Sequence, residues 1–175
     1  MKIKNIKKYI ELYDTEKYLF EVISPKVKKS GYLSFNDFYQ ICMWKSARPK
    51  KRYLNNKESV ENVTKRALLE TDEGRRIKIL CELDGVGIAT ASAILTIIYP
   101  EKYAVIDVRD LEELNKIIKN KIGKTISINT WINYLAEMRK LAKENNATPR
   151  EIDKALFAMN RESLENQNYK NLYQI

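Results

Sequence analysis

The chain has 175 residues, 44% of them hydrophobic and 31% charged, with a formal net charge of +9 and a pI of about 9.4. This composition describes one globular domain that is large enough to bury a core, and its basicity favours a polyanionic partner. Two cysteines without a repeated spacing and the absence of histidine exclude a disulfide framework, a zinc site and catalysis by a histidine base.

Apolar residues recur three and four positions apart along most of the chain, which predicts amphipathic helices and an all-α fold. We expect helices over residues 2–13, 16–23, 35–44, 58–69, 75–83 and 88–99, then from 107 to the glycine at 123, from 129 or 130 to 142, and from 149 to 159. The polar segment 164–175 is expected to be a flexible tail.

No apolar run reaches the ~20 residues that a membrane span requires. The segment MKIKNIKKYIELYD is basic and amphipathic but lacks the apolar core of a signal peptide. We therefore expect a cytoplasmic protein without a membrane partner. Basicity alone is weak evidence for a polyanionic partner, because AT-rich genomes also raise the content of Lys, Ile, Asn and Tyr.

Three helix starts carry capping residues. Ser34 opens the pattern S-F-N-D, which resembles a capping box, and Asp72 is placed to cap the helix that follows it. A third start combines the cap Thr148, a first-turn Pro149 and the capping glutamate Glu151. These signals predict where three helices begin.

The segment KSARPKKRY, residues 45–53, is the most basic stretch of the chain. Two interpretations remain open: a loop that follows a nucleic-acid strand or stacks a base, and a solvated linker between two lobes. The candidate DNA contacts in this segment are Arg48, Lys50, Lys51 and Arg52. The candidate base-stacking residues of the chain are Tyr39, Trp44 and Tyr103, each of which is also a candidate for ordinary packing.

Gly85-Val86-Gly87 predicts a tight turn between two helices, because glycine tolerates positive φ and close approach of the backbone. The second helix begins with the small residues ATASA, so it can lie close to the first. The free N–H groups at its start form a potential anion site. An ordinary helical hairpin with a glycine turn and a buried second helix has the same pattern.

Asp107 follows the short apolar segment 104–106 and opens the next helix. An aspartate at this position is a standard N-cap, usually worth ~1 kcal/mol. Capping would also fix its rotamer, and the helix N-terminus would favour its ionised form, so one side chain can serve both as a cap and in a site.

The stretch LDGVGIATASAIL resembles the helix-hairpin-helix element, L-x-G-V-G-x-x-T-A, of the endonuclease III-like DNA glycosylase superfamily. Asp107 stands at the same distance from the glycine turn as the catalytic aspartate of that family, and I-D-V-R is similar to its V-D-x-H segment, with Arg109 in place of histidine. The resemblance covers residues 75–120. It implies a compact helical domain over residues 1–175, glycosylase-like, with a hairpin at 75–99 and two lobes with a groove between them.

Two departures from the family pattern limit what the resemblance implies. Ala89 stands where bifunctional members carry a lysine, so the Schiff-base nucleophile is absent from that position. Cys42 and Cys81 are the only cysteines, so the four-cysteine iron–sulfur motif is missing. The pattern that remains is that of a monofunctional enzyme with Asp107 as its catalytic residue, which assists water in hydrolysing an N-glycosidic bond during base-excision repair.

The resemblance also implies how DNA is held. The backbone of Gly85, Val86 and Gly87 would anchor a phosphate of double-stranded DNA, with a Na⁺ or K⁺ ion on the carbonyls of the turn and no metal ligands from side chains. Thr90 and Arg109 are further candidate DNA contacts. We expect a monomer associated with the nucleoid. The alternative is a non-catalytic helix-hairpin-helix module with an accessory or defence role, and the recognised base is left open.

Overall fold

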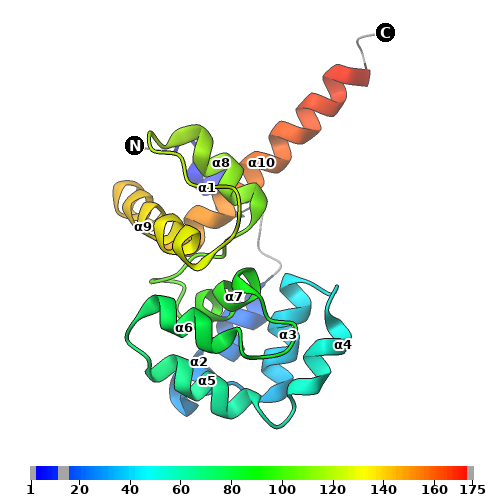
Figure 1. Cartoon of the computed structure of the whole chain (residues 1–175). Helices are drawn as coiled ribbons and strands as arrows, with labels where there is room; N and C mark the ends of the chain where they lie inside the picture. The colour runs from blue at the N-terminus through cyan, green and yellow to red at the C-terminus, as the bar shows by residue number, and fades with distance from the viewer. Residues whose placement is uncertain (1–2, 12–15, 173–175) are drawn as a thin grey trace.

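The computed structural model describes residues 3–11 and 16–172, which form ten α-helices, a π-helix and a 3-10 helix, without a strand (Figure 1). The all-α prediction is therefore confirmed. Among these helices none combines the length and the hydropathy that crossing a bilayer would need.

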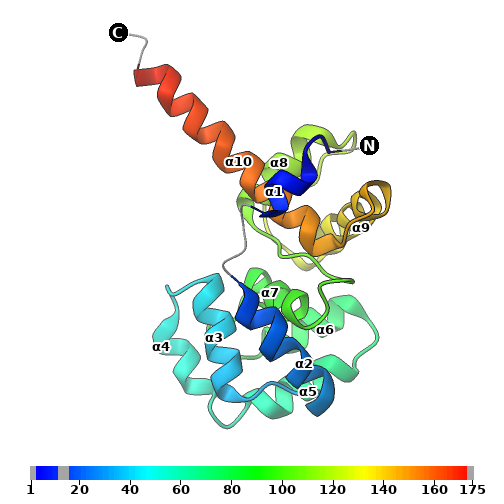
Figure 2. The same ribbon diagram turned by 180° about the vertical axis from the view of Figure 1, so that it is seen from behind.

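Figures 1 and 2 show the helices in two groups, here called the hairpin lobe and the terminal lobe. The hairpin lobe contains η1 (Leu19–Ile23), α2 (Ser24–Ser30), α3 (Phe35–Lys45), α4 (Lys50–Tyr53), η2 (Leu54–Asn56), α5 (Val60–Leu69), α6 (Glu73–Leu80) and α7 (Ile88–Ile98). The terminal lobe contains α1 (Ile6–Glu11), α8 (Val108–Ile117), α9 (Ile128–Asn145) and α10 (Pro149–Leu172).

Within the terminal lobe α1, α8 and α9 all pack against α10, whose C-terminal half extends away from the rest of the molecule (Figure 1). Within the hairpin lobe η1, α2, α3 and α6 surround α7. The two lobes meet where α6 packs against α9, and there Arg139 of α9 donates two hydrogen bonds to Glu73 of α6, at 2.6 and 3.0 Å.

The three predicted caps are confirmed. Asp37 N donates to Ser34 Oγ at 3.2 Å, and Arg75 N donates to Asp72 Oδ1 at 2.7 Å. At the start of α10 the backbone N–H groups and side chains of Thr148 and Glu151 hydrogen-bond reciprocally, as a capping box requires.

Several predicted boundaries were wrong. Helix α8 ends at Ile117 and a loop containing Gly123 follows it, while α9 is capped by Ser127, whose Oγ accepts from Thr130 N at 3.1 Å. Helix α10 continues to Leu172, so most of the expected tail is helical; residues 173–175, like the ends of the first predicted helix, lie outside the described residues. The basic segment 45–53 ends in the short helix α4 and joins elements of one lobe, so it is not a linker between lobes.

Helix α7 is the centre of the hairpin lobe, and all its residues from 90 to 98 are buried. Small side chains at its start let the segment 104–106 lie against it, and Ser92 Oγ accepts a hydrogen bond from Ile106 N at 3.0 Å. From the other lobe, Tyr134 Oη donates to Val105 O at 2.9 Å. These bonds hold the chain just before Asp107, and so they fix the place of that carboxylate between the lobes.

Candidate nucleic-acid site between the lobes

The turn between α6 and α7 requires glycine at position 85. Gly85 has φ +83°, a left-handed conformation that L side chains adopt at a cost. A Cβ atom there would also lie 3.0 Å from the Tyr53 ring and 3.1 Å from Arg52 Cβ. The turn closes with Val86 N donating to Leu83 O at 3.0 Å.

Gly87 has no such structural reason to be glycine. Its φ of −98° and ψ of 178° describe extended backbone, and a Cβ atom added there would meet nothing within 4 Å. Gly87 is the N-cap residue of α7, and no side chain caps this helix. The first N–H groups of α7 therefore have no side-chain acceptor at the cap, and the positive end of the helix dipole lies behind them, as an anion site requires.

Two residues expected to contact phosphate are turned inward. Val86 is 6% exposed and its N–H is already bonded within the turn, and Thr90 is also 6% exposed. The Val86 N–H is therefore not free to donate to a phosphate, and the Thr90 side chain is buried in the free protein, so their contact with DNA stays a prediction. No side chain of the described residues caps the backbone N–H groups at the start of α7.

The basic segment lies directly beside the turn. Together they enclose an open hollow of about 640 Å³, here called the hairpin hollow, which is lined by Ser46, Arg48, Pro49, Arg52, Gly85, Val86 and Gly87. Arg48 and Arg52 thus join the glycine turn at one surface. Lys50 and Lys51 are exposed on α4 but do not line the hollow.

Asn56, which the sequence did not single out, holds the basic segment against the turn. Its Nδ2 donates to Tyr53 O at 3.1 Å and to Asp84 O at 2.9 Å, and its Oδ1 accepts from Asp84 N at 2.7 Å. The Asp84 carboxylate in turn accepts from Asn55 and from Arg52 Nε, and these hydrogen bonds lower its pKa. Arg52 is therefore partly neutralised by Asp84, whereas Arg48 has no carboxylate within 4.0 Å among residues 3–11 and 16–172.

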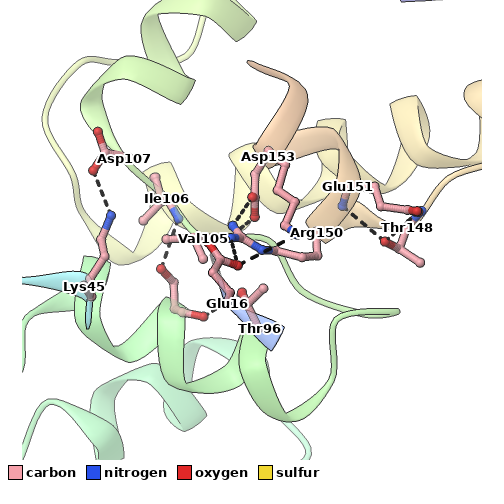
Figure 3. A network of polar contacts seen from close by, with 12 residues as sticks. Glu16, Lys45, Thr96, Val105, Ile106, Asp107, Thr148, Arg150, Glu151 and Asp153 are labelled. Atoms are coloured by element: carbon pink, nitrogen blue, oxygen red, sulfur yellow. Dashed lines mark hydrogen bonds and ion pairs between the residues drawn. The ribbon is translucent and has the colours of Figure 1, made fainter. Parts of the chain in front are cut away.

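Asp107 is the N-cap of α8, as predicted, with Oδ1 accepting from Arg109 N at 3.1 Å. Its Oδ2 lies 2.8 Å from Lys45 Nζ, the last residue of α3 in the other lobe (Figure 3). Burial acts to raise the pKa of Asp107, but the Lys45 ammonium and the Arg109 N–H outweigh it, and the pKa lies below its ordinary value. The carboxylate is thus ionised at neutral pH.

In front of Asp107 lies a cavity of about 370 Å³, here called the carboxylate cavity. It is lined by Trp44, Lys45, Val105, Asp107, Arg109, Asp110, Arg150, Asp153, Lys154 and Phe157. The lining comes from α3 in the hairpin lobe, from α8 and α10 in the terminal lobe, and from the segment before α8. Its volume lies within the range of small-molecule pockets, roughly 300–1,000 Å³.

Of the three aromatic residues proposed to stack a base, Trp44 alone lines this cavity. Tyr103 is 2% exposed and stacks on the buried Trp131 with ring centroids 6.1 Å apart, so it belongs to the core and that expectation was wrong. Tyr39 packs beside Phe35, with ring centroids 6.1 Å apart, and does not line the cavity. Arg109 lines the cavity, and its guanidinium lies over the Phe157 ring at 5.3 Å.

A buried ion-pair network borders the same cavity (Figure 3). Arg150 pairs with Glu16 through Nη2 and with Asp153 through Nη1, and all three side chains are no more than 8% exposed. Asp153 also accepts from Val105 N at 2.6 Å. Burial acts to lower the pKa of Arg150, but the carboxylates of Asp153 and Glu16 act to raise it. The net change is an increase, so the guanidinium stays charged. The network joins three distant parts of the chain at the junction of the lobes.

Sequence reasoning had identified Asp107 but missed Lys45, Asp110, Arg150 and Asp153. Asp110 carried one signal, since it follows Asp107 by three positions and therefore lies on the same side of a helix. Lys45, Arg150 and Asp153 carried none, because only tertiary packing brings them near Asp107: Lys45 across the lobes, and Arg150 and Asp153 through the packing of α10 against α8. Comparison with protein-family models, with curated proteins and with solved structures finds no match to this chain.

Proposed function

We propose that the protein binds double-stranded DNA across the hairpin hollow and hydrolyses the N-glycosidic bond of a base that enters the carboxylate cavity. The observation that carries this proposal is the position of Asp107, which is fixed by its own helix, ionised, and one-third exposed on a cavity between the lobes. An aspartate that served only as a cap would need no such cavity. The glycosylase resemblance of residues 75–120 points in the same direction.

The two surfaces are close enough to act on one strand. Trp44 and Lys45 line the carboxylate cavity, and Ser46 and Arg48, which follow Lys45 within three positions, line the hairpin hollow. A phosphate held at the start of α7 would therefore leave a neighbouring nucleotide near the cavity. A base must leave the helical stack to reach such a cavity, and its deoxyribose would then face Asp107.

The chemistry needs a carboxylate more than it needs any other group. Breaking the bond between base and sugar places positive charge on the sugar, and an ionised carboxylate nearby stabilises that charge and accepts a proton from the attacking water. Lys45 neutralises part of the charge of Asp107 in the free protein. A DNA phosphate near Lys45 would compete for that ammonium and leave Asp107 freer to act. A Na⁺ or K⁺ ion on the turn carbonyls remains part of the proposal.

The test measures base release from duplexes that carry a panel of damaged and mispaired bases. We expect Asp107→Asn to abolish release while the Kd for DNA changes little, and Glu112→Gln, an exposed acid on the same helix, to behave as wild type. Strand cleavage should not accompany release, since Ala89 replaces the lysine of bifunctional members. Release that continues unchanged in Asp107→Asn would refute the assignment.

A second candidate function is DNA binding without catalysis. The observation in its favour is the Lys45–Asp107 ion pair, which is also how a structural aspartate between two lobes would be satisfied. This candidate predicts salt-dependent binding with no base released from any duplex. If a structured RNA competes for the protein as effectively as duplex DNA, the partner would be RNA instead of DNA.

A further inference from the structure

Asp110 is a carboxyl group without an assigned task. It lies one turn after Asp107 on α8, lines the carboxylate cavity and is 3% exposed. Its Oδ1 atom has no hydrogen-bond partner among residues 3–11 and 16–172. A buried carboxylate without donors is costly, so such a group either gains a ligand or keeps its proton.

The charged groups around Asp110 favour the protonated form. Burial raises its pKa well above the ordinary value, and the charges of Asp153 on α10 and Asp107 on its own helix act in the same direction. Lys45 and Arg150 oppose this rise but do not outweigh it. Arg109 and Lys154 line the same cavity as further cations. Tyr134 has its pKa raised by burial and stays neutral.

Asp153 does not take this role from Asp110, because its oxygens already have donors. Arg150 Nη1 and Val105 N both bond to the Asp153 carboxylate. Burial raises the pKa of Asp153 as well, to about 7, although these two donors act to lower it. Of the two buried carboxyls, Asp110 is therefore the better holder of a proton.

We infer that Asp110 donates a proton to the departing base, and that the site therefore acts on uncharged bases, which need a proton to leave. The inference rests on the proposed function and extends it to a second catalytic residue and a substrate class. One cavity would then present an ionised Asp107 to the sugar and a neutral Asp110 to the base. Two carboxyls held in opposite protonation states are the arrangement that acid–base catalysis requires.

The step balances as follows. The bond between the sugar C1′ and the base nitrogen breaks, and both its electrons go to the base. The proton of Asp110 goes to an acceptor nitrogen or oxygen of the base, which departs as a neutral molecule. Water forms the new bond to C1′ and gives its proton to Asp107. Solvent then returns a proton to Asp110 and removes one from Asp107, so that the net reaction is hydrolysis.

Substrates that need no acid provide the sharpest comparison. A purine alkylated at N3 or N7 already carries a positive charge and leaves as a neutral base without further protonation. An uncharged base, such as a deaminated, oxidised or mispaired one, leaves as an anion unless it is protonated. Loss of Asp110 should therefore affect the second kind and spare the first.

The experiment measures single-turnover base release from duplexes that carry either an uncharged lesion or 7-methylguanine. We expect Asp110→Asn to slow release of the uncharged base roughly 10²- to 10⁴-fold, and to abolish the alkaline decline of its pH profile. Release of 7-methylguanine, where the wild type shows it, should change less than about threefold, and Glu112→Gln should change neither. Equal rates for the uncharged base in wild type and Asp110→Asn would overturn this inference and leave the proposed function standing.

A second measurement needs no substrate. Carbon-13 NMR of the aspartate carboxyls, with Asp107→Asn and Asp110→Asn used for assignment, reports which group holds a proton at neutral pH. We expect Asp110 to be protonated and Asp107 ionised. An ionised Asp110 would overturn the inference, whereas a protonated Asp110 in a protein that releases no base from any duplex would overturn the proposed function instead.

Discussion

At the hairpin hollow the cations Arg48 and Arg52 are exposed, whereas at the carboxylate cavity Arg150, Asp110 and Asp153 are almost completely buried. The hollow is built from backbone and from side chains that solvent already hydrates. The cavity is built from ionisable groups removed from water, of which Arg150 and Asp153 pair with each other while Asp110 Oδ1 has no donor among the described residues. Substitutions in the hollow should therefore change DNA binding, and substitutions around the cavity should change stability and proton uptake as well.

The largest effect is expected at Arg150. Arg150→Met removes the cation between two buried carboxylates and leaves Glu16 and Asp153 uncompensated, which should cost about 3–5 kcal/mol of unfolding free energy. Urea denaturation followed by circular dichroism measures the change. The matched control is Arg66→Met, which breaks an exposed pair with Glu82 and should cost no more than about 1 kcal/mol. Similar losses in the two variants would contradict the contrast between buried and exposed charge.

The next largest difference between the hairpin hollow and the carboxylate cavity should be the dependence of stability on pH. Because burial raises the pKa of Asp110, the folded state binds this proton more tightly than the unfolded chain, whose aspartates titrate near pH ~4. The stability from this group is complete below the unfolded pKa and is lost as pH rises toward the folded one, by up to about 1.4 kcal/mol per pH unit.

The measurement is the unfolding free energy at a series of pH values from mildly acidic to neutral. We expect the difference between wild type and Asp110→Asn to change over this range in the direction stated, while Glu112→Gln follows wild type. Asp153 contributes in the same direction, so the difference between variants is the informative quantity. A constant difference across the range would show that Asp110 does not hold a proton.

The two glycines of the turn should differ in how much their substitution reduces stability. Gly85→Ala forces a side chain into a left-handed conformation against Tyr53 and should cost about 1–2 kcal/mol of unfolding free energy. Gly87→Ala should change it by less than about 0.5 kcal/mol, since the backbone is extended and the added Cβ meets open space.

DNA binding should depend on Gly87, the glycine whose substitution is expected to cost little stability. Gly87→Asp places a negative charge at the uncapped start of α7 and should weaken duplex binding on the order of tenfold, whatever the sequence of the duplex. Fluorescence anisotropy with labelled duplexes gives the Kd. Unchanged binding by a folded Gly87→Asp protein would remove the hairpin turn from the DNA-binding surface.

The helices and caps could be predicted because they depend on neighbours in sequence. Ser34, Asp72 and Asp107 each accept a hydrogen bond from an N–H two or three positions ahead, and such patterns are visible in the letters. The partners of the site were not visible. Lys45 reaches Asp107 across 62 positions and Arg150 reaches Glu16 across 134, and only the packing of the lobes creates these pairs.

The aromatic residues also show that sequence alone does not reveal which side chains line the site. Trp44 and Tyr103 both looked suited to stack a base, but the first borders the cavity and the second lies in the core against Trp131. A large apolar ring has the same local pattern in either place, so its role depends on the tertiary structure. The inward turn of Thr90 was hidden for the same reason.

The smallest expected effect is at Arg48, which is exposed on the hairpin hollow and contributes little to stability. If Arg48 neutralises one phosphate, Arg48→Ala should reduce the slope of log K against log salt by about 0.9. Titrations at several salt concentrations measure that slope, and Lys65→Ala on α5, exposed and lining neither the hollow nor the cavity, is the control with equal loss of charge. Equal slopes in the two variants would mean that Arg48 acts only through net charge, and the contact surface would then exclude the basic segment at this position.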